Sequence, residues 1–437
     1  MTGAAGFRRE LGLGDAALVV AGGIARVLET PALILLAWTI GGAVALIGGF
    51  VWAELGSRFP DVGGQYVYLA RAYPPVVGFL YGVALLFIIN GGSLAAVSMI
   101  FASYVDRSLI PLGPTGIRVA AAAALVTLTG INALGVRAGK WTTNILMAAK
   151  VGGILVLVAL AFGRGSTPAS DFAAASPVAA AAWPRLLLTA LVPILFAYGG
   201  WQSCASIAGE IRNPVRNLAR ANVLGVLLVI ALYLSLNVAY LWALTPAQIA
   251  ASPALAADMA RAVAGEVGAR FVAILIVISS LGFLAVVIMT GARLYYAMAA
   301  DGLFFPPAAR LHPRYQTPVF ALWCQAAVSL ALMTTNSYDQ LLSYVVFADW
   351  LFFGLTAGAL FVVRWRGEAA GSGVFRAPGH PWTTGAFVLV AAGVVVNTFF
   401  VYPTQSLIGA AILTGAAIGF TLMPRSRKRG RKVGASL

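Results

Sequence analysis

Eleven long apolar segments constrain this chain more than any other feature of its sequence. Each is near the roughly 20 residues that a helix needs to cross a bilayer, and short loops with charged residues, proline or glycine separate them. Because 60% of the residues are hydrophobic and only 10% are charged, the chain has too little polar surface to cover a water-soluble globule of its length. We therefore expect an all-α polytopic membrane protein. The segments span residues 32–52, 76–105, 119–134, 143–163, 186–207, 221–244, 271–292, 318–334, 341–363, 383–402 and 406–423.

A twelfth apolar stretch precedes these segments and is unusually short. It runs from Ala16 to Ala25, about ten residues, before Arg26 interrupts it. On length alone it does not cross a hydrocarbon layer that is roughly 30 Å thick. We therefore expect the first helix to be truncated.

The formal charge of +15 reflects membrane topology rather than binding of nucleic acid. If residues 16–25 count as one crossing, 21 of the 29 basic residues fall on one side of the membrane, including the basic tail, and seven fall on the other. Basic residues concentrate in cytoplasmic loops. We therefore expect a cell-membrane protein with a cytoplasmic C-terminus, its tail near anionic lipid headgroups.

Residues that carry enzyme, metal or redox chemistry are sparse. Cys204 and Cys324 lie in apolar segments without metal or disulfide spacing, and His312 and His380 fall in loops. No cluster of His, Asp and Glu occurs within the segments, so no catalytic residue, metal or cofactor is expected. No soluble domain interrupts the segments, so the chain is predicted to form a single membrane domain over 1–437. Residues 1–14 do not have the pattern of a cleaved signal peptide.

Lys150 is the first candidate for a functional residue within a segment. It lies in the middle third of residues 143–163, between Ala149 and Val151. An ammonium group at this depth costs about 3 kcal/mol, so we expect it to face a partner or a cavity. The alternative is a structural lysine that extends from near the helix end toward the interface.

A predicted helix break is the second candidate. Residues 193–203 place Gly199 and Gly200 between Tyr198 and Trp201, and each glycine weakens a helix by roughly 1 kcal/mol relative to alanine. Unwound backbone at membrane depth is tolerated where it faces protein or a wet cavity, and many transporters build a substrate site there. A glycine hinge that binds no ligand is the alternative.

Several motifs in one order give the chain a family resemblance. It resembles the amino acid–polyamine–organocation (APC) permeases, and within them the bacterial relatives of L-type amino acid transporters. The motifs are Trp52-Ala-Glu-Leu-Gly56, Pro60-x-x-Gly-Gly-Gln-Tyr66, Asn132-x-x-Gly-Val-Arg137, Lys150, Phe196-Ala-Tyr-Gly-Gly-Trp201, Glu210-Ile-Arg-Asn-Pro214, Arg293-Leu-Tyr-Tyr, Asp301-Gly302, His312-Pro-Arg-Tyr-Gln-Thr-Pro318 and Phe375-Arg-x-Pro-Gly379.

The resemblance implies a LeuT-type fold with two inverted repeats of five helices and two extra helices. The first repeat would span residues 16–163, the second 186–363 and the extra helices 383–423, followed by a basic tail at 424–437. The first helix of each repeat would be broken and would hold the substrate. The implied substrate-binding residues are Ala21, Gly22, Gly23, Ile24, Phe196, Ala197, Tyr198, Gly199, Gly200 and Trp201.

The resemblance also implies secondary-active, sodium-independent uptake or exchange of amino acids. Lys150 matches a lysine that, in this family, reaches toward the position of sodium in sodium-coupled relatives. Ser279 and Ser280 lie beside it on this reading, or serve only in helix packing. The aromatic residues near the break favour neutral substrates, and the scarcity of acidic residues in the segments argues against polyamines. Asp349 is the exception, and we expect it to cap a helix or to pair locally.

The first helix departs from the family pattern. Either Gly22-Gly23-Ile24 is what remains of the usual glycine motif, or the motif is missing and Arg26 already belongs to the next loop. This helix should supply backbone groups for the substrate. A transport-impaired protein that serves in binding or sensing is therefore the alternative function. The sequence leaves the oligomeric state and the particular amino acid undefined.

Overall fold

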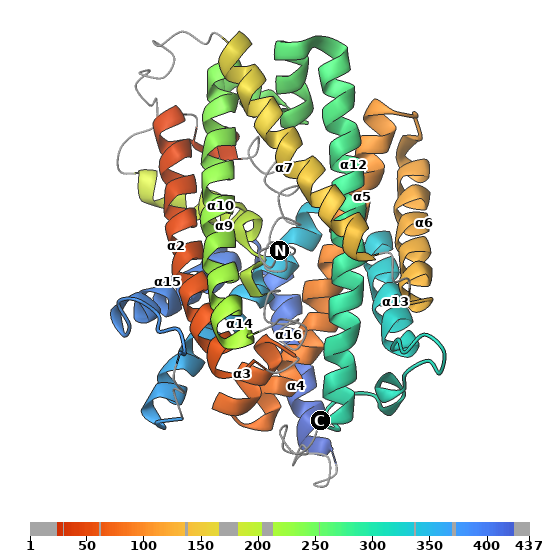
Figure 1. Cartoon of the computed structure of the whole chain (residues 1–437), viewed down its shortest axis with the longest axis vertical. Helices are drawn as coiled ribbons and strands as arrows, with labels where there is room; N and C mark the ends of the chain where they lie inside the picture. Colours follow the sequence, from red (N-terminus) through yellow and green to blue (C-terminus); the bar gives the residue numbers. More distant parts are fainter. Residues whose placement is uncertain are drawn as a thin grey trace.

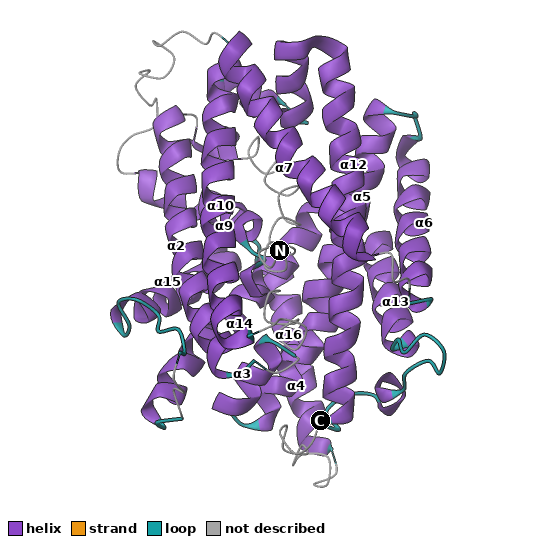
Figure 2. Cartoon of the chain, viewed as in Figure 1, coloured by secondary structure: helices purple, strands orange, loops and turns teal. Residues whose placement is uncertain are grey.

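Helices account for all regular structure in the part of the chain that the computed structural model describes (Figure 2). That part comprises residues 24–28, 30–60, 63–135, 139–165, 182–202, 213–252, 254–335, 338–368 and 373–423. No strand occurs among these residues. The protein is thus an all-α polytopic membrane protein, as the apolar segments predict.

Every one of the eleven predicted segments falls on a helix, and most helices extend beyond the predicted ends. In the described part of the chain, eight helical stretches are long and apolar enough to cross a membrane, and α9 and α13 are shorter apolar helices. The helices are α2 (Pro31–Arg58), α4 (Pro75–Ala84) with the π-helical turn η2 (Leu85–Ile89) and α5 (Asn90–Ser108), α6 (Gly113–Ala133), α7 (Gly139–Arg164), α9 (Trp183–Tyr198), α10 (Pro214–Ala243), α12 (Leu255–Ala300), α13 (Val319–Thr335), α14 (Tyr338–Trp365), α15 (Trp382–Val401) and α16 (Pro403–Leu422).

Short helices also connect these elements, among them α3 (Gln65–Ala72), α11 (Pro246–Ala251) and the 3-10 helix η5 (Pro306–Ala309). Many helices, among them α2, α4 and α10, carry proline in their first turn. Proline suits this position because the first backbone N–H groups of a helix have no partner within the helix. Thr245 starts α11 with a capping box that includes Gln248.

Two helices differ from the predicted segments in a way that matters for function. The segment 186–207 is not one continuous helix, because α9 ends at Tyr198. The segment 271–292 is the central part of the much longer α12, which contains a non-helical residue, Gly265, with φ 67°. Glycine adopts this left-handed conformation without the steric cost that other residues meet.

Helices from the first half of the chain pack beside helices from the second half (Figure 1). α2 lies along α10, α5 lies along α12, and α6 packs against α13. Small residues allow the first of these approaches, since a methyl group added at Gly42 would lie 3.2 Å from Ile230 and one added at Gly49 would lie 3.1 Å from Val226.

Several predictions fall on residues that the structure does not describe. Ala21, Gly22 and Gly23, most of the stretch 16–25 and the basic tail 424–437 lie outside the described residues. The truncation of the first helix therefore stays a prediction. Residues 24–28 are helical, and Ile24 is buried.

Candidate functional site

The predicted helix break is present at Gly199 and Gly200. α9 ends at Tyr198, where Gly199 turns to an extended conformation with ψ 165°, and Gly200 follows with φ 127°. The backbone N–H of Gly199 bonds the carbonyl of Phe196 at 3.0 Å, which tightens the last turn. A side chain at Gly200 would be strained because the positive φ is unfavourable for other residues. The pair of glycines thus ends the helix within the apolar segment.

Backbone polar groups at the break form hydrogen bonds with side chains, some near in the sequence and some distant. The Tyr233 hydroxyl of α10 donates to the carbonyl of Ala197 at 3.2 Å, and the Gly200 N–H donates to Gln202 Oε1 at 2.8 Å. The end of a helix exposes carbonyl groups with partial negative charge, which favours a cation nearby. The ammonium group of an amino acid has the chemistry that such an end can hold.

Aromatic side chains enclose the break on two sides. The Tyr198 ring lies 5.6 Å from Trp38 and 5.2 Å from Tyr233, and its hydroxyl donates to the Trp38 carbonyl at 3.1 Å. The indole of Trp201 lies 5.5 Å from Phe353 of α14. All of the predicted residues from Phe196 to Trp201 are buried. The break therefore lies inside the helix bundle and does not face lipid.

Lys150 lines a pocket between α7 and α12. The pocket is small and partly open, and Lys150 and Ser279 are its polar residues. Its apolar walls come from Gly153, Ile154, Leu157, Val272, Leu275 and Ile276. The buried lysine therefore lies at a small, partly open pocket between the two helices. The structure brings Lys150 and Ser279 to one pocket, whereas Ser280 is buried and does not line it.

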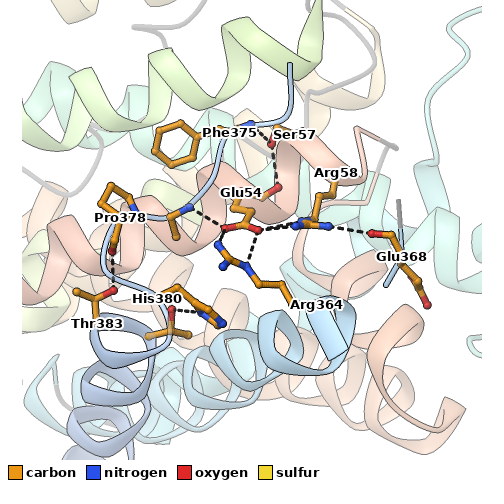
Figure 3. Close-up of polar contacts among 11 residues, drawn as sticks. Glu54, Ser57, Arg58, Arg364, Glu368, Phe375, Pro378, His380 and Thr383 are labelled. Atoms are coloured by element: carbon orange, nitrogen blue, oxygen red, sulfur yellow. Dashed lines mark hydrogen bonds and ion pairs between the residues drawn. The ribbon is translucent and has the colours of Figure 1, made fainter. Parts of the chain in front are cut away.

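Glu54 forms the centre of a buried ion network at one end of the bundle (Figure 3). Its carboxylate is fully buried at the end of α2. Arg58 donates to Oε1 at 3.0 and 2.8 Å, and Arg364 of α14 donates to Oε1 at 2.9 Å and to Oε2 at 2.6 Å. The Ala377 N–H donates to Oε2 at 2.7 Å. One carboxylate thus ties α2, α14 and the loop before α15 together.

His380 lies close to this network, just before α15. Its Nδ1 is 2.9 Å from the Thr384 hydroxyl. Burial lowers the pKa of this imidazole, and the positive charge of Arg364 lowers it further. The neutral form of His380 is therefore favoured in the folded protein.

Residues of other sequence motifs form hydrogen bonds with each other at the helix ends. The Tyr66 hydroxyl of α3 donates to Asp301 Oδ2 at 2.8 Å, just after α12. The Thr317 hydroxyl donates to the Ala133 carbonyl at the end of α6 at 2.7 Å. Burial raises the pKa of Asp301, while the bond from Tyr66 opposes this shift. Burial and the Asp301 charge both raise the pKa of Tyr66.

Sequence reasoning missed these pairings. Glu54, Tyr66, Asp301 and Ala377 all stand within the motifs that carry the family resemblance, so the signal marked the residues. It did not indicate which residues pair with each other, because the partners lie up to 323 residues apart in the sequence.

The expectation that Asp349 caps a helix is wrong. This residue lies well inside α14, so it caps no helix end. It makes no ion pair or hydrogen bond with any residue that the structure describes, so it has no local partner among them.

The described residues include no group of three His, Cys, Asp or Glu side chains that could hold a metal.

Comparison with known proteins gives one consistent result. A family model described as amino acid permease matches residues 12–422. The large neutral amino acids transporter small subunit 2 of Rattus norvegicus is 30% identical over 385 residues, which cover 83% of this chain and 72% of the relative. The b(0,+)-type amino acid transporter 1 of Homo sapiens is 31% identical over 338 residues, 76% of this chain and 68% of the relative. The Asc-type amino acid transporter 1 of Mus musculus is 30% identical over 385 residues, covering 83% of this chain. All three are named as transporters, not as enzymes.

Proposed function

Because the chain belongs to the amino acid permease family of the APC superfamily, we propose that it is a sodium-independent secondary transporter that takes up or exchanges neutral amino acids. It is a multi-pass membrane protein whose relatives are named as amino acid transporters. The positive-inside asymmetry of its loops supports insertion in the cell membrane with a cytoplasmic C-terminus.

The helix break at Gly199 and Gly200 is the observation that carries this proposal. A solute site needs polar groups at membrane depth, and backbone freed at a break supplies them without a buried charge. The substrate ammonium would lie at the carbonyl end of α9, where the helix dipole favours a cation. The remaining substrate contacts would come from the backbone of the other broken helix, at Ala21 to Ile24.

The aromatic surroundings support neutral substrates. Phe196, Tyr198 and Trp201 carry no charge and are buried around the break. Apolar and aromatic walls with a few placed polar groups suit a neutral side chain, since a charged one would lose its hydration without a counter-ion.

A LeuT-type arrangement of two five-helix repeats is part of the proposal. In such an arrangement, equivalent helices of the two repeats pack as pairs around an axis in the membrane plane. The pairing of α2 with α10, of α5 with α12 and of α6 with α13 supports this division, because each pair joins helices at equivalent places in the two halves.

Sodium independence rests on Lys150. Its ammonium group lines the pocket beside Ser279, where it would supply a fixed positive charge in place of a bound cation. Replacement of sodium by choline should therefore leave transport unchanged. The Lys150→Ala variant should lose transport, because the pocket would then lack its charge.

The test is uptake of labelled leucine and alanine into proteoliposomes, with and without unlabelled amino acid inside. We expect uptake that internal amino acid accelerates and sodium does not alter. Gly200→Ala should reduce it strongly, because the positive φ strains alanine at the break. Gly130→Ala on α6 is the matched control, because an added methyl group meets no atom within 4 Å there.

The shortness of the first apolar stretch favours one other function. With about ten residues before Arg26, the first broken helix would supply fewer backbone groups, and a binding or sensing protein would result. Specific binding of amino acids without any flux would support this alternative. If the protein shows neither binding nor flux, both functions are refuted.

A further inference from the structure

Asp349 is a carboxylate within a membrane-spanning helix that the transport scheme leaves unused. It lies eleven residues after the start of α14 and sixteen before its end, which corresponds to about 16 and 24 Å along the helix. The side chain is partly buried. Ionised carboxylates at this depth are costly and mark ion or proton pathways or substrate sites in membrane proteins.

Among the described residues, the helices that pack most extensively on α14 bring no cation to Asp349. The packed elements are α2, α3, α5, α9, α15, α16 and η2, and the last three carry no charged or titratable side chain. Arg364 on α14 itself lies fifteen residues away, about 22 Å along the helix. The groups on the other four elements make no ion pair or hydrogen bond with Asp349. They are Glu54, Arg58, Arg71, Asp106, Arg107 and Arg185, with the tyrosines Tyr66, Tyr68, Tyr104 and Tyr198.

Tyr81 of α4 is a titratable group that interacts with Asp349. The two side chains interact electrostatically, and Tyr81 is buried. Phe352, three residues further along α14 and on the same helix face, packs its ring 5.2 Å from the Tyr81 ring. Both observations direct the Asp349 face of α14 toward Tyr81.

Polar groups continue from Tyr81 to the end of the bundle that carries most basic residues. The Tyr81 hydroxyl lies 3.5 Å from Gln65 Oε1, at the start of α3. Gln65 Nε2 is buried and has no hydrogen-bond partner among the described residues, so a water molecule suits this position. The next residue, Tyr66, donates to Asp301, which is partly exposed. The Tyr81 hydroxyl and the Gln65 amide thus lie between the Asp349 face of α14 and the start of α3, where Tyr66 and Asp301 pair.

We propose that Asp349 is a proton-binding site and that a proton crosses the membrane with each amino acid. This inference rests on the proposed transport function. The carboxylate takes up a proton from the outer solution, and its neutral form suits the apolar surroundings. It then releases the proton toward the cytoplasm, on the side where Tyr81, Gln65 and the pair of Tyr66 and Asp301 lie. The proton alone changes place, and no other bond forms or breaks.

Proteoliposomes with an entrapped pH-sensitive dye test this inference. An interior one pH unit more alkaline than the exterior should drive leucine accumulation up to about tenfold, because one pH unit is a tenfold ratio of protons. The dye should report acidification of the interior that depends on leucine. Asp349→Asn should abolish both effects and keep leucine counterflow, which does not need a net proton. Asp349→Glu should retain part of both effects.

A matched control removes one carboxylate elsewhere. Glu266→Gln on the exposed part of α12 removes a negative charge whose side chain is 68% exposed, and should leave pH-driven accumulation unchanged. Counterflow in the same vesicles reports whether each variant is folded. If Asp349→Asn does not fold, the proton site is tested by leucine-dependent acidification, compared between the wild-type protein and Asp349→Glu.

The outcomes separate this inference from the transport function itself. Wild-type counterflow without leucine-dependent acidification overturns the proton site and leaves the transporter standing. Accumulation that persists in Asp349→Asn overturns the site as well. Uptake of arginine that moves no proton and is lost in Asp349→Asn would assign the carboxylate to a cationic substrate. Absence of counterflow in the wild type refutes the transport function and this inference with it.

Discussion

Substitution of Glu54 by glutamine should destabilise the bundle strongly. The change keeps the shape of the side chain and removes its charge, while the two arginines remain. Glu54 accepts four hydrogen bonds from guanidinium groups and one from the Ala377 backbone. A glutamine has one acceptor oxygen, and its amide N–H groups would face the donors of Arg58 or Arg364.

The size of the effect follows from the burial of the partners. Removal of one member of a buried ion pair costs about 3–5 kcal/mol, because the remaining charge lacks compensation. The Glu54 side chain is 0% exposed and that of Arg58 is 6% exposed, but that of Arg364 is 26% exposed, so water can solvate part of its charge. We therefore expect the lower end of this range, about 3 kcal/mol.

Equilibrium unfolding of the protein in mixed micelles, titrated with a denaturing detergent, measures this loss. Glu368→Gln is the control, because the pair of Arg366 and Glu368 is 3.9 Å apart and both side chains are more than a third exposed. Such a surface pair contributes about 0–1 kcal/mol. A double-mutant cycle of Glu54→Gln with Arg364→Gln should give a coupling energy above about 1 kcal/mol. A loss below about 1 kcal/mol for Glu54→Gln, or strict additivity in the cycle, would refute this reasoning.

Three further substitutions probe other contacts. Tyr66→Phe removes the hydrogen bond to Asp301 and should cost about 1.5–3 kcal/mol in the same titration, since the acceptor is charged; no loss would mean that the bond does not form. Gly48→Ala should cost about 1–3 kcal/mol, because the added methyl group would lie 2.8 Å from Phe387, whereas Gly393→Ala meets no atom within 4 Å and should be neutral. The lowered pKa of His380 predicts that stability falls as the pH drops below about 6.5, because the unfolded state then binds a proton first. His380→Gln should remove this part of the pH dependence, and an unchanged profile would contradict the assignment.

Much of the fold could be predicted from the sequence because the membrane imposes local requirements. A segment in lipid must satisfy its backbone groups internally, so about 20 apolar residues specify a helix without reference to any neighbour. The eleven segments follow this rule closely. The break at Gly199 is also local, since two adjacent glycines weaken the helix wherever it packs.

Part of the candidate site depended on neighbours and was predicted less well. For Lys150 the sequence left a functional and a structural role open, and only the packing of α7 on α12 shows that this residue lies at a pocket. The two serines could not be ranked from the sequence, while the helical rotation of about 100° between adjacent residues turns Ser279 to the pocket and Ser280 away from it. Asp349 was expected at a helix end or in a local pair because the extent of α14 and the groups around it are not local properties.

The sequence by itself determined that the protein is helical, spans a membrane many times, breaks a helix at Gly199 and belongs with amino acid permeases. Only the tertiary structure decided that Glu54 binds Arg364, that Tyr66 binds Asp301 and that Phe352, on the Asp349 face of α14, packs on Tyr81. Helix formation depends on residues within a few turns, whereas each of these contacts joins groups more than 200 residues apart. Such contacts form when whole helices pack, and their specificity comes from the shape and charge of both surfaces.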